Sequence, residues 1–83
     1  MKGSVRVLFF SALREFLQSR EMWVQIEEGV QAGDLLDCLK SEYPQAALLF
    51  EQARTAVNHK ITGREQTLKD GDEIALLLPV SGG

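Results

Sequence analysis

The two most apolar segments of this chain lie near its two ends. Residues 4–10 are rich in β-branched and aromatic side chains, and residues 73–78 read Glu-Ile-Ala-Leu-Leu-Leu. Both segments are typical of strands. A chain of 83 residues buries roughly 60–65% of its unfolded surface, which is enough for one hydrophobic core. We therefore expect these strands to be neighbours at the centre of a sheet, within a single domain spanning residues 1–83.

Periodicity predicts the elements between these strands. Apolar residues recur at helical spacing over residues 12–18 and 32–43, and Pro44 ends the longer helix. Residues 22–26 and 55–58 are typical of strands, residues 47–54 of a brief helix, and residues 70–72 of a turn. The fold class is α+β, a mixed sheet with one main helix on one face. The expected core comprises Val5, Val7, Phe9, Leu35, Leu39, Ile74 and Leu76.

Composition excludes several classes of function. Nine Lys and Arg against twelve Asp and Glu give a net charge of −3, which argues against nucleic acid as a partner. The longest apolar run, residues 74–80, is far shorter than the ~20 residues of a membrane span. The single cysteine, Cys38, cannot form an internal disulfide, and together with the single histidine, His59, it leaves a zinc site short of ligands. We expect a cytoplasmic chain with no membrane partner and no bound metal or cofactor.

The segment Pro79-Val80-Ser81-Gly82-Gly83 follows the last predicted strand. A frayed end is one interpretation, since termini are commonly disordered. The other is a flexible tail, from about residue 79 to residue 83, that projects from a rigid sheet. A Gly-Gly carboxylate lacks Cβ atoms, so it could enter a narrow channel. Because a carboxylate is a poor electrophile, it would need activation, for instance as a mixed anhydride with AMP. A partner would supply that step, since the chain has no phosphate-binding loop.

The chain resembles the small subunit of molybdopterin synthase, a ubiquitin-like sulfur carrier with a β-grasp fold. The likeness runs from residues 7–10 through residues 35–39 and 56–58 to residues 68–75 and the final Pro-Val-Ser-Gly-Gly. The Asp-Gly-Asp-Glu stretch at residues 70–73 recurs in β-grasp proteins, and the final run at this spacing is more specific. Two departures are visible: Leu78 stands where the family often has proline, and Leu76 and Leu77 where aromatic residues are common.

This resemblance implies a chemical role for the tail. An E1-like adenylyltransferase would consume ATP to adenylate Gly83, and a sulfur donor protein would convert the adenylate to a thiocarboxylate. Gly82 would let the tail enter the large synthase subunit. There the sulfur would pass to cyclic pyranopterin monophosphate and form the dithiolene of molybdopterin. The chain would be an enzyme only as one subunit of the synthase, a heterotetramer of two small and two large subunits.

Alternation also predicts a partner-binding surface. Phe10 and Leu77 point away from the predicted core on adjoining strands, and Ile61 completes an apolar patch. With Pro79, Val80 and Ser81, these residues are expected to bind the large subunit.

Five other side chains receive structural interpretations. Cys38 is expected to fill a small gap at the edge of the core, and His59 to be solvated in a turn. Asp70 and Asp72 are interpreted as turn formers. Trp23 is expected to be partly packed by the loop after the first helix.

Two other functions remain open at this point. One is a sulfur carrier for thiamin or for tRNA thiolation, against which the Pro-Val-Ser run argues. The other is a protein modifier conjugated to lysines through Gly83, which shares the same activation chemistry.

Overall fold

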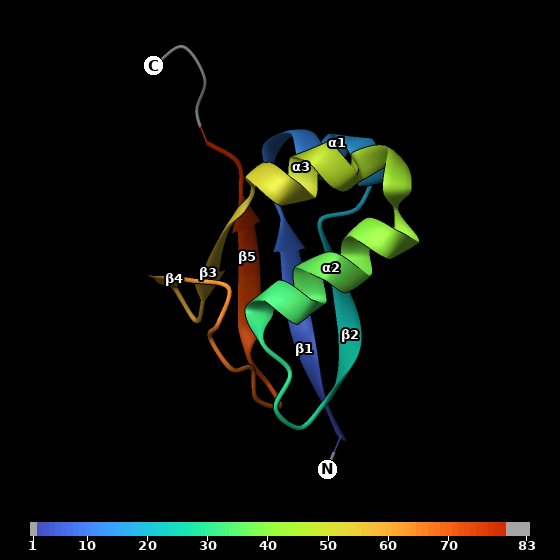
Figure 1. Ribbon diagram of the computed structural model, residues 1–83. Helices are drawn as coiled ribbons and strands as arrows, with labels where there is room; N and C mark the ends of the chain where they lie inside the picture. The colour runs from blue at the N-terminus through green and yellow to red at the C-terminus, as the bar shows by residue number, and fades with distance from the viewer. Residues whose placement is uncertain (1, 80–83) are drawn as a thin grey trace.

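The computed structural model describes residues 2–79, and its strands form one mixed sheet (Figure 1). The strands are β1 (Lys2–Phe9), β2 (Glu21–Glu27), β3 (Arg54–Val57), β4 (Lys60–Thr62) and β5 (Glu73–Leu77). The helices are α1 (Ser11–Leu17), α2 (Ala32–Glu42), the 3₁₀ turn η1 (Pro44–Ala46) and α3 (Ala47–Gln52). The strand order is β2-β1-β5-β3-β4, and β1 pairs with β5 in parallel. The first and last strands are therefore neighbours at the sheet centre, as the sequence predicted.

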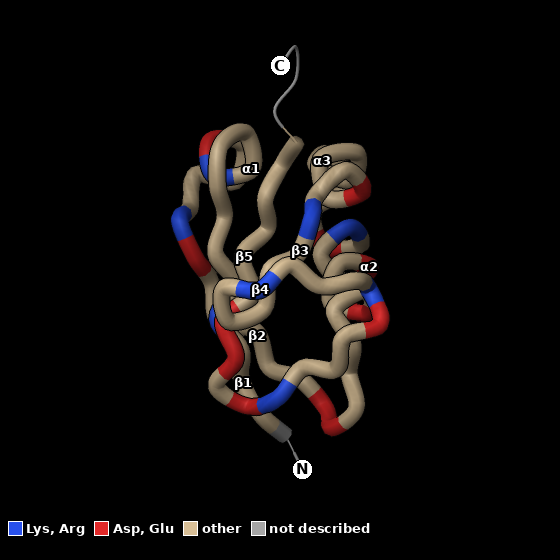
Figure 2. Tube along the Cα trace, turned by 90° about the vertical axis from the view of Figure 1, so that its left-hand side faces the viewer, with Lys and Arg blue, Asp and Glu red and all other residues tan. Residues whose placement is uncertain are grey.

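The helices divide the sheet into two different faces. The long helix α2 lies across one face, and α1 and α3 lie at the end where β5 finishes (Figure 1). Figure 2 shows no helix over the middle of the opposite face. We call the face under α2 the inner face and the opposite one the outer face. None of the helices within residues 2–79 combines the length and the apolar content needed to cross a membrane.

The core lies between α2 and the inner face. Every core residue expected from the sequence is buried there, and Leu13 of α1 and Phe50 of α3 close it at the end of the sheet. The alternation of β1 and the helical spacing of α2 therefore predicted their buried sides correctly.

A turn at residues 70–72 fixes how β1 lies beside β5. The backbone N–H of Ser4 donates to Asp70 Oδ1 at 2.8 Å, and the N–H of Gly71 donates to the Ser4 carbonyl at 2.8 Å. Gly71 has φ +89°, which glycine adopts without strain. A Cβ on Gly3 would lie 2.7 Å from Asp70 Cβ, so only glycine permits this close approach. The acidic turn residues are thus structural, as expected.

One strand was missed by the sequence prediction. The three-residue strand β4 pairs antiparallel with β3 through a two-residue turn in which Asn58 and His59 have φ of 50° and 74°. Positive φ at both central residues is the requirement of a type I′ hairpin turn. The prediction recognised the turn but not the strand, because three residues carry too little alternation.

Two side-chain predictions are wrong. Cys38 is exposed rather than packed in the core, and Trp23 is 63% exposed. Both residues line a groove at the β2 edge, where the sheet formed by residues 2–79 ends. Helical spacing identifies the apolar side of a helix, but not how far the sheet beneath it extends.

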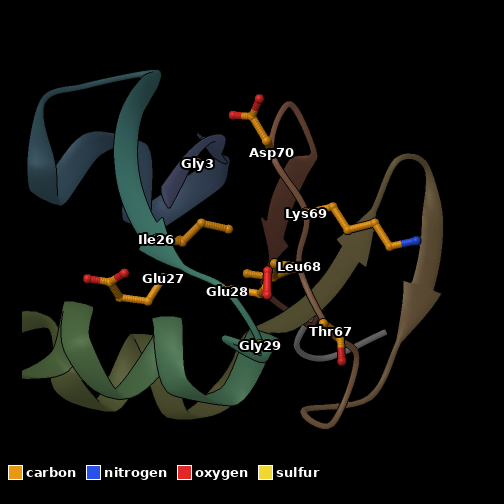
Figure 3. Close-up of a pocket in the computed structure, with 9 residues that line it drawn as sticks. All are labelled: Gly3, Ile26, Glu27, Glu28, Gly29, Thr67, Leu68, Lys69 and Asp70. Atoms are coloured by element: carbon orange, nitrogen blue, oxygen red, sulfur yellow. The ribbon is translucent and has the colours of Figure 1, made fainter. Parts of the chain in front are cut away.

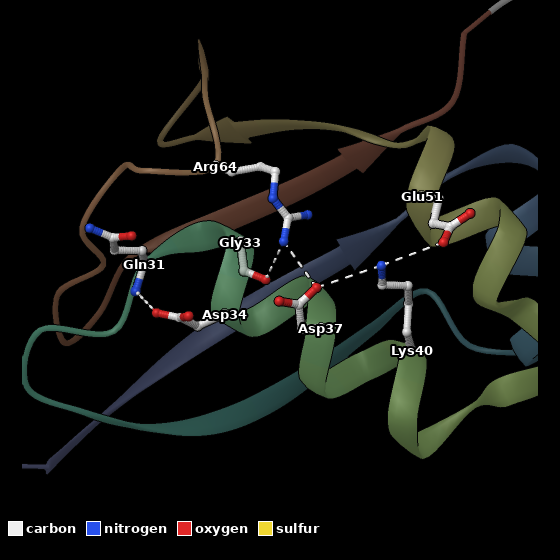
Figure 4. Close-up of polar contacts among 7 residues, drawn as sticks. All are labelled: Gln31, Gly33, Asp34, Asp37, Lys40, Glu51 and Arg64. Carbon is white, nitrogen blue, oxygen red and sulfur yellow. Dashed lines mark hydrogen bonds and ion pairs between the residues drawn. The ribbon is translucent and has the colours of Figure 1, made fainter.

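Arg64 joins the loop after β4 to α2 (Figure 4). Its Nη2 donates to Asp37 Oδ1 at 2.9 Å and to the Gly33 carbonyl at 3.3 Å, and its own carbonyl accepts the Gly33 N–H at 2.8 Å. Lys40 Nζ lies 3.6 Å from Asp37 Oδ1 and 3.7 Å from Glu51 Oε1. These contacts hold the irregular segment before β5 against the helix.

We expect Leu39→Ala to destabilise the protein by about 2–5 kcal/mol, because the truncation leaves a cavity between α2 and the sheet. Leu39 is only 3% exposed, so its side chain is fully engaged in the core. Urea denaturation measures the free energy of unfolding. Leu48→Ala on exposed α3 is the control and should have little effect. A loss below about half a kcal/mol for Leu39→Ala would show that this side of α2 does not carry the core.

The hydrogen bond from Arg64, followed by the charges of Arg64 and Lys40, lowers the pKa of the Asp37 carboxyl below its ordinary value. We expect Arg64→Gln to raise that pKa in an NMR titration, and Lys40→Gln to raise it less. Because the pKa is lower in the folded state, the stabilisation is present above the ordinary Asp pKa of about 3.9 and is lost as the pH falls through the folded value. Equal shifts for the two variants would contradict the dominant role of Arg64.

Candidate functional site

The outer face carries a continuous apolar surface across four strands. The strand register places Leu8 against Ala75, Ala75 against Ala56, and Ala56 against Ile61. This row runs from β1 through β5 and β3 to β4. The side chain of Ile61 is 62% exposed, while Leu8 and Ala75 are half-buried. The two alanines keep the middle of the row shallow, so that a partner could approach the sheet closely.

A second row lies beside the first, toward the end of β5. Phe9 pairs with Leu76; the next residues along the chain are Phe10, just beyond β1, and Leu77, the last residue of β5. Phe10 is 40% exposed and Leu77 is half-buried. We define the outer-face patch as these two rows: Leu8, Phe10, Ala56, Ile61, Ala75 and Leu77.

Charged side chains border the outer-face patch on the side away from the end of β5. Arg6 forms ion pairs with two glutamates: its Nε lies 3.0 Å from Glu21 Oε1, and its Nη1 lies 3.6 Å from Glu73 Oε2. The contact of Nε with Glu21 does not have the geometry of a hydrogen bond. His59 Nε2 lies 3.8 Å from Glu73 Oε1 and is largely solvated, as expected. Exposed ion pairs contribute little to stability. They are better suited to orient a partner on the apolar surface.

The chain leaves β5 at the edge of the outer-face patch. Leu78 is half-buried against the core, and Pro79 is exposed. In Figure 2 this part of the chain passes between α1 and α3. Each of these helices presents an exposed apolar side chain, Phe16 on α1 and Leu48 on α3. Both helices at this end of the sheet therefore add exposed apolar side chains, while the exposed Arg54 lies opposite Leu77.

The structure brings together part of the predicted site. Phe10 and Leu77 are neighbours, and Ile61 is joined to them through Ala56 and Ala75. Pro79 follows directly at the exit. The remaining predicted residues, Val80, Ser81, Gly82 and Gly83, lie outside the described residues.

Sequence reasoning missed three members of the outer-face patch and Leu48. The alternation of β1 could have identified Leu8, because it lies between Arg6 and Phe10 on the same face. Ala56 and Ala75 become recognisable only from the register, since small residues carry no signal of their own.

A hollow lies at the other end of the sheet (Figure 3). It is about 410 Å³ and is lined by Gly3, residues 26–29 and residues 67–70. It is open rather than enclosed, and it is remote from the exit of β5. Within residues 2–79 no group of His, Cys, Asp and Glu side chains could hold a metal ion. We take as the candidate site the outer-face patch together with the chain's exit, an apolar surface suited to docking.

Comparison with known proteins gives a consistent result. Residues 7–83 match the model of the ThiS family. A molybdopterin synthase sulfur carrier subunit of Mycobacterium tuberculosis is 35% identical over 80 residues, which cover 95% of this chain and 96% of that protein.

Two solved structures share the fold. The small archaeal modifier protein 1 of Methanosarcina acetivorans is 28% identical, with a TM-score of 0.82 and coverage of 100% of this chain and 99% of that one. A protein-protein complex of subunits 1 and 2 of the molybdopterin-converting factor of Helicobacter pylori contains a chain that is 25% identical. Its TM-score is 0.67, with 96% of this chain and 99% of that chain covered. These likenesses extend over nearly the whole length of each protein.

Proposed function

Because the chain belongs to the ThiS family, we propose that it is a sulfur carrier, the small subunit of a molybdopterin synthase. The observation that carries this proposal is the 35% identity to a named sulfur carrier subunit over nearly the full length of both proteins. The β-grasp fold, shared with ubiquitin-like proteins, supports it. So does the apolar face beside the end of β5, since a carrier must be held by its partner while its end reacts.

The proposed chemistry takes place at Gly83. A carboxylate oxygen of Gly83 attacks the α-phosphorus of ATP on an activating enzyme of the E1 type, and pyrophosphate leaves. A persulfide of a donor protein then attacks the acyl carbon and AMP leaves. A thiol cleaves the S–S bond of the resulting acyl disulfide, which leaves the thiocarboxylate on Gly83 and a disulfide on the donor side. The thiocarboxylate sulfur attacks a carbon of cyclic pyranopterin monophosphate in the large subunit and displaces the oxygen substituent of that carbon, and two carriers are used for the two sulfurs of the dithiolene. Hydrolysis of the acyl bond returns the carboxylate and leaves the sulfur on the substrate. The reaction consumes ATP only at the partner, which fits the expected cytoplasmic location.

The outer-face patch is the proposed docking surface for the large subunit. An apolar surface whose centre is shallow and whose border is charged has the anatomy of a protein interface. Docking on this face brings the end of β5 to the partner, so that residues 80–83 enter its active site. The proposed assembly contains two small and two large subunits. The complex of subunits 1 and 2 in the related Helicobacter pylori protein supports a large-subunit partner.

A second candidate function is conjugation of Gly83 to protein lysines. The likeness to a small archaeal modifier protein favours it, because activation of the carboxylate is common to both functions. Purification from the native cell separates the two. A carrier copurifies stoichiometrically with one larger protein, whereas a modifier appears as a ladder of conjugates. A carrier for thiamin or tRNA thiolation would instead copurify with a different partner and would not restore molybdopterin formation.

We expect removal of Gly83 to nearly abolish sulfur transfer while docking survives. The shortened tail loses about 3.3–3.6 Å of reach. A misplacement of 1 Å can cost about a hundredfold in rate. Intact mass after incubation with activating enzyme, ATP and sulfur donor should show one exchange of oxygen for sulfur in the full chain. This measurement also tests whether Gly83 carries the terminal carboxylate.

Gly82→Val is the companion variant, and we expect it to reduce sulfur transfer as well. Its β-branched side chain restricts the backbone and would be too bulky for a narrow channel. Thermal unfolding of both tail variants should match that of the unchanged protein. Near-normal molybdopterin formation by the shortened chain would contradict the role of Gly83.

We expect Leu77→Asp and Phe10→Asp each to weaken large-subunit binding by at least about tenfold, because a buried carboxylate loses its hydration without gaining a partner. Isothermal titration calorimetry measures the affinity. Gln45→Asp on exposed η1 is the control, since it adds the same charge on the helix side of the molecule. Unchanged affinity in the two patch variants would remove the outer face as the docking surface. Loss of folding would instead show that these side chains are needed in the core.

A further inference from the structure

Among the described residues, one edge of strand β2 is unpaired. The register of β2 with β1 shows which β2 residues direct their backbone N–H and C=O groups toward that open edge. Phe9 N–H donates to the Arg20 carbonyl at 2.9 Å, and the same antiparallel register continues along β1 and β2. Backbone groups of alternate residues point to opposite edges of a strand. Met22, Val24 and Ile26 therefore direct their N–H and C=O groups to β1, as Arg20 does. The groups of Trp23 and Gln25 point to the open edge.

The carbonyls at the two ends of this edge already accept hydrogen bonds. The Glu21 carbonyl accepts the Ser19 hydroxyl at 2.8 Å, and the Glu27 carbonyl accepts the Val30 N–H at 3.2 Å. No strand within residues 2–79 pairs with the open edge of β2. Trp23 and Gln25 thus offer two donors and two acceptors in the arrangement that an added strand requires.

A groove runs beside this edge, between β2 and α2. It is about 230 Å³ and is lined by Met22, Trp23, Val24 and Gln25 of β2 and by Cys38, Leu39, Glu42 and Tyr43 of α2 and its C-terminal end. A strand added to β2 would direct every second side chain toward the α2 side of the sheet, into this groove. Cys38 is exposed on the α2 side of this groove.

The charges around the edge select the occupant. Glu21 and Glu27 lie at the two ends of β2 on the outer face, and Glu42 lines the groove. Arg6 pairs with Glu21, and the register places Lys2 opposite Glu27, while Glu42 adds a carboxylate at the groove. Trp23, 63% exposed on the outer face, offers a ring on which an Arg or Lys side chain can lie.

A second copy of the chain is disfavoured in the register that overlaps the two β2 strands fully. In a symmetric antiparallel pairing of two β2 strands centred on Val24, Trp23 lies opposite Gln25 of the other copy. Glu21 then lies opposite Glu27 at both ends. Like charges directly opposite one another destabilise a strand pair.

We propose that the open edge of β2 binds an extended segment of a partner protein, apolar on one side and basic on the other. The segment pairs with Trp23 and Gln25, places its apolar side chains in the groove beside α2, and places its basic side chains over Trp23 and near Glu27. This site lies across the sheet from Ile61 on β4. It is independent of residues 80–83 and adds a recognition function to sulfur transfer.

The probe is an acetylated and amidated seven-residue peptide that alternates lysine or arginine with valine. Titration is followed by NMR and by amide hydrogen exchange. We expect the Trp23 and Gln25 amides to become protected, while the Met22 and Val24 amides, already bonded to β1, change little. A peptide with glutamate in place of every basic residue should not bind. A chain lacking Gly82 and Gly83 should bind the basic peptide as well as the full chain does, which separates this proposal from that for the tail.

A matched pair of variants tests the strand pairing itself. Gln25→Pro removes an N–H that faces the open edge and leaves the bonds to β1 intact, which is where proline is tolerated in a sheet. Gln25→Ala keeps that N–H. We expect Gln25→Pro to weaken peptide binding roughly 5- to 100-fold, because an acceptor of the peptide loses its donor, and Gln25→Ala to have little effect. Circular dichroism verifies that both variants fold.

Three outcomes would overturn the proposal: no protection of Trp23 and Gln25 up to millimolar peptide, equal affinity of the Gln25→Pro and Gln25→Ala variants, or equal binding of the acidic peptide. Dimerisation of the free chain through β2, detected by sedimentation and abolished by Gln25→Pro, would make a second copy the occupant instead. Should Gln25→Pro fail to fold, the exchange pattern of the unchanged protein still decides the case.

Discussion

The parallel pairing of β1 with β5 is the constraint on which the rest of the structure depends. It brings Arg6 opposite Glu73 and Phe9 opposite Leu76, so two segments more than sixty residues apart in sequence become neighbours. Closing so long a loop costs conformational entropy. The cost is offset by burial of Val5, Val7, Ile74 and Leu76 and by the turn at residues 70–72, which bonds directly to β1.

This one pairing also creates the functional surface. Because the two strands run in the same direction, they end together, and Phe10 and Leu77 appear side by side at the end of the sheet. Their inner neighbours, Phe9 and Leu76, are buried. Because neighbouring residues of a strand point to opposite faces, burial of Phe9 and Leu76 on the inner face places Phe10 and Leu77 on the outer face. The apolar residues on the outer face are partly exposed, so they contribute less to folding stability than buried residues do. Binding to a partner explains their presence there better than folding stability does.

The sequence predicted the arrangement of the core better than the surface. Alternation and helical spacing report which side chains point inward, and this is why Val7 and Leu39 were placed correctly. They do not report where the sheet ends, and the exposed Trp23 and Cys38 at its edge were therefore misjudged. The strand β4 was too short to recognise. In the site, Phe10 and Leu77 were found from alternation, and Ile61 was added as an apolar residue that completes the patch. The pairing of Ala56 with Ala75 and with Ile61 required a register that only the fold supplies. Residues 80–83 lie outside the described residues, so their proposed role rests on the family and on the exit of β5.

The central position of β5 has a consequence for how a carrier of this kind works. β5 pairs with β1 on one side and with β3 on the other. The end of β5 therefore cannot shift without breaking backbone hydrogen bonds to at least one of these strands. Leu78 remains packed against the core just beyond the strand. The point from which residues 79–83 depart is therefore held by the most buried part of the molecule. A partner that docks on the outer-face patch thereby also fixes where the reacting end begins. In such an arrangement, loosening β5 impairs transfer even when docking is retained, because the position of the reacting atoms is what the sheet controls.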